Sequence, residues 1–430
     1  MIGRAAAAGA AIAAVGLVVS GTGADADTSL GRAGLAGLLL VTGSCVLAAA
    51  AVGSFTGVLA GWLPTRRWPV ARLAVSNLAR SPARTAGTAV SILIGVGLVM
   101  LTTVLTSSFQ ANVSNSVGRI YRGDAVVAGS SGMPGVARSD AARFDDAVGV
   151  ASSTSVRSGP VKFGSNVGTA IALDGRAFLG PAFSPAAISS FTGDGILVRA
   201  GLGLSPGSEI TVTGAEAAVE TTVTGTFSGR LVDGSGARIE VVLPLELADK
   251  VLPAGPDDAV LTRTTGDVDP AALDRADADA ALDVLSVSGF ARRTASSADR
   301  AFALSVALLA MTLVTSVIGL ANTVVASVAE RRREISVLRA LGLGAGQLAR
   351  LITLETAILA AMVAVAATAV AVGTGALLIG SVAPRGTPIS VPWVRIATIG
   401  AAATVLCSLA GLVPAQRATR IPVNEGLVEE

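Results

Sequence analysis

The stretch Ala86–Thr106, AGTAVSILIGVGLVMLTTVLT, contains no charged side chain. A helix that crosses the hydrocarbon core of a bilayer needs about 20 mostly apolar residues, and this stretch supplies them. In the whole chain of 430 residues, 51% are hydrophobic and only 14% are charged, with a mean hydropathy of +0.68. Apolar residues gathered in such long blocks predict an integral membrane protein rather than a series of soluble domains.

Further apolar blocks of similar length lie on both sides of this stretch. They are Ala5–Ala24, Ala33–Leu63, Ala301–Ala326, Thr356–Val382 and Ile396–Pro414. The predicted fold class is therefore an α-helical polytopic membrane protein with about six transmembrane helices. The first block could instead be a signal peptide, because Arg4 precedes it and small residues follow it.

Arginine marks the segments that we expect inside the cell. Pro64–Thr85 holds five arginines and no acid, and Ser327–Arg350 is also rich in arginine. Short cytoplasmic loops collect Arg and Lys, whereas long segments cross the membrane regardless of charge. Between Phe109 and Arg300 acids outnumber bases. We therefore expect Phe109–Arg300 outside and both chain termini inside; if the first block is cleaved, only the N-terminus changes sides.

The apolar blocks divide the chain into successive parts. These are two accessory spans (1–63), a cytoplasmic amphipathic lead-in (64–85), the third span (86–107), an extracytoplasmic domain (108–300), the fourth span (301–326), an arginine-rich cytoplasmic segment (327–350), the fifth span (351–382), an outer loop (383–395), the sixth span (396–415) and a cytoplasmic tail (416–430).

The long segment between the third and fourth spans is large enough to bury a core of its own. Strand-like runs recur at Asp124–Ala128, Val167–Leu173, Gly195–Arg199, Glu209–Thr213, Glu220–Phe227, Arg238–Leu243, Asp258–Thr262 and Leu282–Val287. Helices are expected at Ser139–Ala147, Leu245–Val251 and Pro270–Ala280. Turn signals such as Asp233-Gly234 separate these runs. The pattern predicts an α+β extracytoplasmic domain inserted between the third and fourth spans.

The composition of this domain gives little support for a catalytic function. It contains neither His nor Cys, so the commonest metal ligands and nucleophiles are missing, and its acids suit a solvated surface. We expect no catalytic residue, no metal and no cofactor. A net charge of +2 also gives no reason to expect a nucleic-acid partner.

A charged motif follows the fourth span, at Ala329–Gly342, AERRREISVLRALG. Its apolar residues Ile335, Leu338 and Leu341 could face one way while the arginines face another, which is typical of an amphipathic helix at a membrane surface. Gly342 then serves as its C-terminal cap. The plainer interpretation is an arginine-rich anchor that only fixes the orientation of the chain.

The motif resembles the FtsX-like permease domain of ABC transporters, of the MacB and LolC type. The residues that carry this resemblance are Glu330, Glu334, Leu338, Arg339, Gly342 and Glu355. The layout from about Arg72 to Gly426 is similar to the four-helix module of that family, with its large outside domain between the first and second helices. Together with the two spans that precede it, the chain is similar to the last six spans of a ten-span permease. Gly195–Thr213 also looks like a common stretch of the family's outside domain.

The resemblance implies that the coupling segment, residues 327–350, docks on a cytoplasmic ABC ATPase. The docking residues would be Glu330, Arg331, Arg332, Arg333, Glu334, Ile335, Leu338, Arg339 and Gly342. The arginines would supply charged contacts, while Ile335 and Leu338 would fill an apolar groove. Closure of the ATPase would then move the helices and rearrange the outside domain. Val70–Ala79 resembles the family's amphipathic lead-in helix.

The ATPase is expected in a separate polypeptide. No Gly-Lys-Ser/Thr sequence occurs in the chain, which excludes a Walker A loop. The glycine run Gly342–Gly346 follows a predicted helix rather than a strand, so it suits a turn better than a phosphate-binding loop. The chain is thus expected to be a non-catalytic subunit of a bacterial plasma-membrane transporter that exports or extracts a hydrophobic or peptide-like substrate.

One acid, Glu355, lies about one turn inside the fifth span. A carboxylate within a membrane span is costly and often functional. Near the end of a helix it can also reach the interface, where it would pair with Arg350 or Arg339. Both interpretations stay open at this stage.

Two further questions stay open as well. The family's large members have two such modules, whereas one is visible in this sequence. A partner that supplies the other half, a homodimer or a truncated reading frame would each account for this difference. In each case the spans are expected to contact membrane lipid. The function could also be signalling, in which the outside domain activates a cell-wall hydrolase or senses a peptide. A membrane enzyme is a third possibility, disfavoured by the lack of His and of paired acids in the spans.

Overall fold

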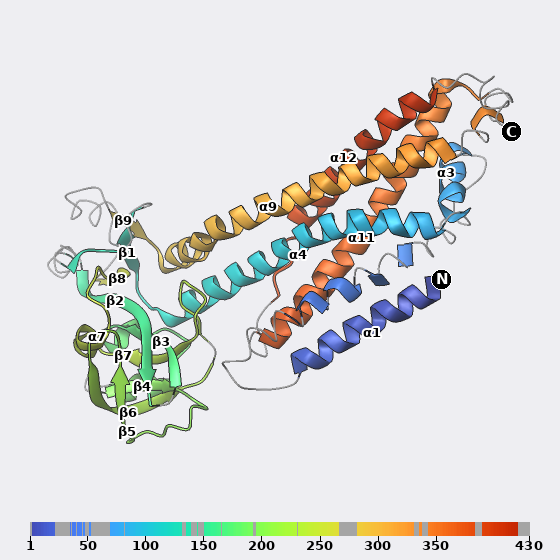
Figure 1. Ribbon diagram of the computed structural model, residues 1–430. Helices are drawn as coiled ribbons and strands as arrows, with labels where there is room; N and C mark the ends of the chain where they lie inside the picture. The colour runs from blue at the N-terminus through green and yellow to red at the C-terminus, as the bar shows by residue number, and fades with distance from the viewer. Residues whose placement is uncertain are drawn as a thin grey trace. The chain divides into compact units, whose positions relative to one another are not determined.

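The structure is a computed structural model of the chain. It describes residues 2–21, 35, 37–39, 41–44, 46–47, 51–52, 69–80, 82–130, 135–138, 144, 150–164, 166–191, 195–229, 231–265, 282–330, 335–337, 343–382 and 389–419. The chain divides into a helical unit, Met1–Ser108 with Phe302–Glu430, and an inserted unit, Phe109–Ala301. Figure 1 shows the long helices of the first and the strands of the second.

Long helices make up the helical unit. The described ones are α1 (Ile2–Gly21), α3 (Pro69–Arg80), α4 (Pro82–Ile120), α9 (Val287–Glu330), α11 (Ala345–Val382) and α12 (Trp393–Thr419). Helix α4 begins at Pro82, as expected for a residue whose missing N–H costs nothing in the first turn. Both α4 and α9 continue along the chain from one unit into the other.

Four of these helices contain a stretch long and apolar enough to cross a membrane. The stretches are Thr85–Ile120, Leu309–Glu330, Ala345–Ile379 and Trp393–Leu412. The prediction of a polytopic helical membrane protein is confirmed. The count of six spans stays a prediction, because the apolar part of α1 is only Ala7–Gly16 and most of Ala33–Leu63 falls outside the described residues.

Helix α3 is amphipathic, as its sequence predicts. Ala74, Val75 and Leu78 are buried, whereas Arg72 is exposed. Leu73 is 51% exposed and lines a cavity described below. The buried face gives α3 a fixed place among the helices that carry the candidate spans.

The inserted unit consists mainly of strands. They are β1 (Ala125–Gly129), β2 (Val150–Phe163), β3 (Asn166–Ala172), β4 (Gly195–Arg199), β5 (Glu209–Thr213), β6 (Ala218–Phe227), β7 (Ile239–Leu243), β8 (Ala259–Thr264) and β9 (Leu282–Leu285). Short helices are η1 (Arg176–Phe178), α6 (Pro185–Ser190) and α7 (Leu245–Val251). Both strands and helices are present, in agreement with the predicted α+β class.

Strand β2 takes part in two sheets. Its first half pairs antiparallel with β8 from Val150 to Val156, and its second half pairs with β3 from Arg157 to Phe163. Because β2 also pairs with β5, the strands β3, β7, β4, β6, β5 and β2 close into a barrel-like ring. Strands β8, β1 and β9 continue the sheet beyond β2.

The change of sheet is visible in the burial pattern of β2. Side chains alternate between two faces along a strand, yet the neighbours Val156 and Arg157 are both buried. Val156 belongs to one hydrophobic cluster of the unit, and Val161 and Phe163 belong to another. The alternation therefore shifts by one residue where the strand passes from one sheet to the other.

The expected strands correspond to eight of the nine observed ones, with ends displaced by a few residues at most. Helix α7 has the predicted bounds. Strand β2 was missed, because its broken alternation and its Gly159-Pro160 pair hide the signal. Helix α6, whose Ser184 hydroxyl caps the amide of Ala187, was also missed. The helices expected at Ser139–Ala147 and Pro270–Ala280 fall largely or wholly outside the described residues.

Candidate functional site

The coupling segment, residues 327–350, begins within the last turn of α9. Glu330 is the last residue of α9 and is exposed. Ile335–Val337 form a short helical piece. The other predicted docking residues, Arg331, Arg332, Arg333, Glu334, Leu338, Arg339 and Gly342, lie outside the residues that the structure describes. Their expected roles therefore stay predictions.

Ile335 packs within its own chain. Only 7% of it is exposed, and it clusters with Leu348 and Ile352 of α11. Two residues later Val337 is 44% exposed. In this arrangement Ile335 fixes the segment to α11, so a contact of its side chain with a partner's groove would require the segment to move.

Helix α11 starts directly after the coupling segment's turn. Gly344 accepts hydrogen bonds from the amides of Gln347 and Leu348, at 3.0 and 3.1 Å between N and O. The side-chain oxygen of Gln347 accepts in return from the Gly344 amide, at 3.2 Å. These bonds satisfy backbone groups in the first turn of the helix. They show that the glycine run forms a helix entry, as the turn interpretation predicted.

A cavity of about 800 Å³ lies beside the segment. Its lining comes from α3, the first turns of α4, the last turns of α9, the residues Ile335, Val337 and Leu343, and the first turns of α11. Glu355 is half-buried and belongs to this lining, whereas Arg350 is exposed. The structure therefore places the predicted membrane acid in a cavity wall next to the coupling segment.

At the other end of α4, the last turn is fixed to the inserted unit by backbone hydrogen bonds. The amide of Gly180 donates to the carbonyl of Ile120 at 2.7 Å, and the amide of Ala182 donates to that of Arg119 at 2.9 Å. The amide of Arg122 donates to the carbonyl of Phe178 at 2.8 Å. Carbonyls at a helix end have no partner within the helix, so these amides satisfy them and hold the helix end in place.

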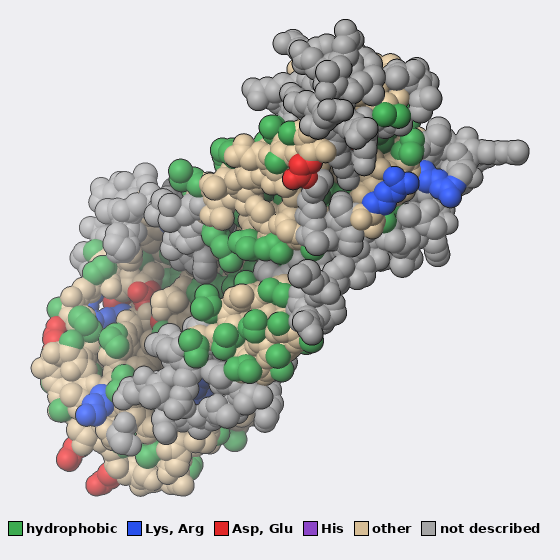
Figure 2. Space-filling model, turned by 45° about the vertical axis from the view of Figure 1, so that its right-hand side comes forward, with side chains coloured by type: hydrophobic (Ala, Val, Ile, Leu, Met, Phe, Trp, Pro, Cys, Tyr) green, Lys and Arg blue, Asp and Glu red, His purple; other side chains and the backbone are tan. Residues whose placement is uncertain are grey.

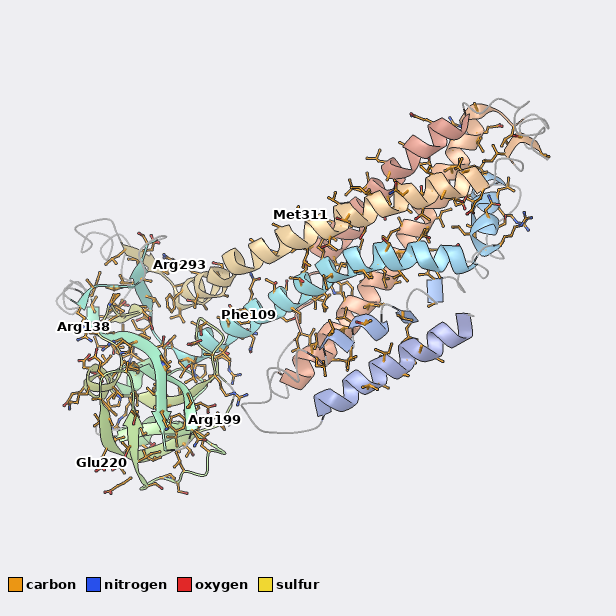
Figure 3. All side chains as sticks on the ribbon, viewed as in Figure 1. Phe109, Arg138, Arg199, Glu220, Arg293 and Met311 are labelled. Carbon is orange, nitrogen blue, oxygen red and sulfur yellow. The ribbon has the colours of Figure 1, made fainter. Side chains whose placement is uncertain are left out.

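Arg293 makes the corresponding connection for α9. Its Nη1 donates to Oδ2 of Asp283 in β9 at 2.6 Å, and its Nη2 donates to the carbonyl of Gly129 in β1. Figure 3 labels Arg293 on α9. One side chain thus joins α9 to two neighbouring strands, β1 and β9.

The loop Asp233–Ala237 contacts both helices within the inserted unit. Oδ1 of Asp233 accepts from the amides of Ser235 and Ala237, each at 2.9 Å, which stiffens the loop. A Cβ built on Gly234 would lie 2.5 Å from Cγ2 of Thr294 in α9. At Gly236 a Cβ would lie 2.7 Å from Cζ of Phe109, a residue of α4 labelled in Figure 3. A stiff loop therefore lies against both helices.

Replacing Gly236 by alanine tests this contact. Gly236 has a φ of +83°, and Gly203 has a similar φ of +75° but no heavy atom within 4 Å of its Cβ position. Gly203→Ala is expected to cost about 1 kcal/mol of unfolding free energy, from backbone strain alone. Gly236→Ala adds the collision with Phe109, for a total of about 2–4 kcal/mol. Urea unfolding of the full chain, read by proteolysis, measures the difference.

A second substitution identifies the source of that cost. Phe109→Leu removes the ring that the new methyl group meets, so the double variant is expected to regain about 1 kcal/mol relative to the sum of the two single variants. Additive effects, or equal costs at the two glycines, would show that the loop does not press against α4.

Sequence reasoning did not single out these connections. Asp233-Gly234 was recognised as a turn, but nothing in the sequence indicated that the turn contacts α4 and α9. Arg293 and Gly180 carry no local signal, because their partners lie far away along the chain. Among the described residues, no group of three or more His, Cys, Asp or Glu side chains is arranged to hold a metal ion.

The coupling segment lies within a region of the chain that matches a known family model. Residues 306–423 match the family model described as FtsX-like permease C-terminal. This region is similar to the C-terminal part of FtsX-like permeases. The resemblance predicted from the charged motif is thereby confirmed. The permease domain contains the whole coupling segment together with α11 and α12.

At the level of the family, the permease domain supports an ABC-type permease, a transporter component that is generally non-catalytic and that works with an ABC ATPase. Among solved structures, the periplasmic region of MacB from Actinobacillus actinomycetemcomitans is similar at 11% sequence identity. The match covers 39% of this chain and 90% of that chain, with a TM-score of 0.27. No curated protein sequence matches the chain.

Proposed function

We propose that the chain is the membrane subunit of an ABC transporter of the FtsX, MacB and LolC type, which works with an ATPase carried by a separate polypeptide. The observation that supports this most is the permease-domain match over residues 306–423, which spans the arginine-rich coupling segment. The substrate would be hydrophobic or peptide-like and would be exported or extracted on the outer side of a bacterial plasma membrane. The complete transporter would contain a second permease half or a second copy of this chain.

In this proposal α9 transmits the movement. Its last residue, Glu330, belongs to the coupling segment, and Arg293 near its start is hydrogen-bonded to β1 and β9. A helix is stiff along its axis because each turn is hydrogen-bonded to the next. A displacement of the coupling segment would therefore reach the strands without substrate passing through the helices.

The docking surface would consist of the arginines and their flanking acids. Arg331, Arg332, Arg333 and Arg339 would make the charged contacts with the ATPase, and Glu330 and Glu334 would flank them. Leu338 would enter an apolar groove of the partner, with Ile335 joining it when the segment moves. Gly342 would end the docking helix. Arginine suits such contacts, since its planar guanidinium pairs with carboxylates through two hydrogen bonds.

The charge-reversed variant Arg332→Glu/Arg333→Glu tests the docking role. The full chain is purified in mild detergent from its native membrane, and quantitative mass spectrometry identifies the polypeptides that accompany it. We expect a stoichiometric ABC ATPase with the wild type and at least a tenfold lower ratio with the variant, because close charged contacts at interfaces contribute about 1.5 kcal/mol or more.

Arg395→Glu provides the matched control. Arg395 is exposed near the start of α12, on the side that the charge pattern places outside the cell. Its reversal is expected to leave the ATPase ratio unchanged. If no ATPase accompanies the wild type while other membrane complexes remain intact, the transporter proposal fails. A sensor kinase or a hydrolase found in its place would favour signalling.

A further inference from the structure

The cavity beside the coupling segment is lined by both apolar and polar side chains. Leu320 and Leu359 line it and lie within the apolar stretches of α9 and α11. Asn77 and Arg80 line it from α3, the amphipathic helix outside those stretches. Its volume of about 800 Å³ lies within the range of about 300–1,000 Å³ that is typical of small-molecule sites. Such a site fits an amphiphile better than a wholly polar ligand.

Arg80 is the cation that α3 contributes to the lining, and α3 carries no acid. Arg72, the other arginine of this helix, lies outside the lining. Figure 2 shows basic side chains of the helical unit gathered toward one end of it. A guanidinium recognises phosphate through charge-assisted hydrogen bonds. The α3 side of the cavity therefore suits a headgroup with a net negative charge.

Glu355 sets where that headgroup can lie. Its carboxylate is in the part of the lining that belongs to α11. The described cation of the lining is on α3 and its carboxylate is on α11, so an anionic headgroup is favoured beside Arg80 rather than beside Glu355. The acyl chains then extend toward Leu320 and Leu359.

We propose that this cavity binds one anionic glycerophospholipid of the inner leaflet, with its phosphate on Arg80 and an acyl chain between α9 and α11. The binding site itself does not depend on the proposed transport function. One consequence does rest on it, because Ile335 and Val337 of the coupling segment also line the cavity. A bound lipid would hold that segment in its present position and so tune the docking of the ATPase.

The test uses the full chain purified in detergent and stripped of lipid, without an ATPase. Native mass spectrometry measures the affinity for phosphatidylglycerol and for phosphatidylcholine with the same acyl chains. We expect phosphatidylglycerol to bind at least about tenfold more tightly, with one molecule per chain retained most strongly. Arg80→Gln should lower that affinity about tenfold, whereas Arg72→Gln, on an exposed residue of the same helix outside the lining, should leave it within twofold.

Two more variants establish whether the lipid occupies this cavity and what charge it carries. Leu73→Trp enlarges a lining residue and is expected to abolish the tight binding, while circular dichroism shows that the variant is folded. Glu355→Gln is expected to keep or raise the affinity for phosphatidylglycerol. Equal binding of the two lipids, equal effects of Arg80→Gln and Arg72→Gln, or unchanged binding by Leu73→Trp would each overturn the proposal. Loss of affinity in Glu355→Gln would also overturn it and would indicate a cationic amphiphile.

The outcome is independent of the proposed transport function. Lipid affinity is measured on the isolated chain, so failure there leaves the ATPase result untouched. Conversely, a chain that binds phosphatidylglycerol at Arg80 but has no ATPase partner would keep the lipid site and lose the transporter function.

Discussion

Replacing Arg157 by methionine is expected to destabilise the inserted unit by about 3–5 kcal/mol. Its Nη1 donates to Oδ1 of Asp249 at 2.5 Å, and its Nη2 donates to the carbonyl of Pro253 at 2.7 Å. Its Nε lies 3.6 Å from Oδ1 of Asp257. The side chains of Arg157 and Asp257 are only 5% and 4% exposed. Without the guanidinium, the carboxylate of Asp257 would stay buried with no cation beside it.

The position of Arg157 increases the effect. It is the residue at which β2 passes from the β8 sheet to the barrel-like ring, and its partners lie in α7 and in the loop before β8. A single side chain therefore joins β2 to residues 249–257, which lie more than 90 positions further along the chain. Loss of a partner from a buried ion pair is costly because the remaining charge can be neither solvated nor paired.

Urea unfolding of the purified full chain, followed by pulse proteolysis of the inserted unit, measures the free energy of unfolding of that unit. Lys250→Met is the control, because it breaks the exposed pair with Glu246 and should cost no more than about 0.5 kcal/mol. The double variant Arg157→Met/Asp257→Asn removes the buried charge and should recover at least about 1 kcal/mol. A loss below about 1 kcal/mol for Arg157→Met would contradict the assignment.

Gly180→Ala is the second substitution with a large expected effect, a loss of about 3 kcal/mol or more. A Cβ at Gly180 would lie 2.9 Å from both the carbonyl carbon and the oxygen of Ile120, and closer still to the oxygen of Arg119. These obstacles are backbone atoms, which cannot rotate away as a flexible side chain can. The new methyl group would separate the end of α4 from the 180–182 segment and break its hydrogen bonds.

The matched control is Gly255→Ala, in the same unit, where no heavy atom lies within 4 Å of the Cβ position. Its effect is expected to stay within about 0.5 kcal/mol. Thermal unfolding of the full chain should show a midpoint about 6–12 °C lower for Gly180→Ala and almost unchanged for Gly255→Ala. Similar midpoints for the two variants would mean that the end of α4 is not held as described.

The membrane-spanning part of the fold could be predicted from the sequence for a simple reason. A lipid bilayer requires about 20 consecutive apolar residues in a spanning helix, so the signal is local and long. Ala86–Thr106 and Thr356–Val382 both lie within helices that contain candidate spans. Strands such as Gly195–Arg199 and Glu209–Thr213 were also predictable, because β-branched and apolar residues recur between turn signals.

The candidate site was predictable only in part. The motif Ala329–Gly342 indicated the permease family, and residues 306–423 confirm it. The sequence did not reveal that Ile335 packs on Leu348 and Ile352, nor that Glu355 lines a cavity with Arg80. Those neighbours are brought together by the packing of α3, α9 and α11, and helix packing has no local sequence signature.

By itself, then, the sequence determined the membrane class, the inserted α+β domain and the arginine-rich segment, since hydropathy, alternation and charge are properties of neighbouring residues. Only the tertiary structure decided that β2 serves two sheets around Arg157, that Gly180 holds the end of α4 to the 180–182 segment, and that Arg293 joins α9 to β1 and β9. These features depend on hydrogen bonds and ion pairs between residues far apart in the chain. Their geometry exists only once the backbone is folded.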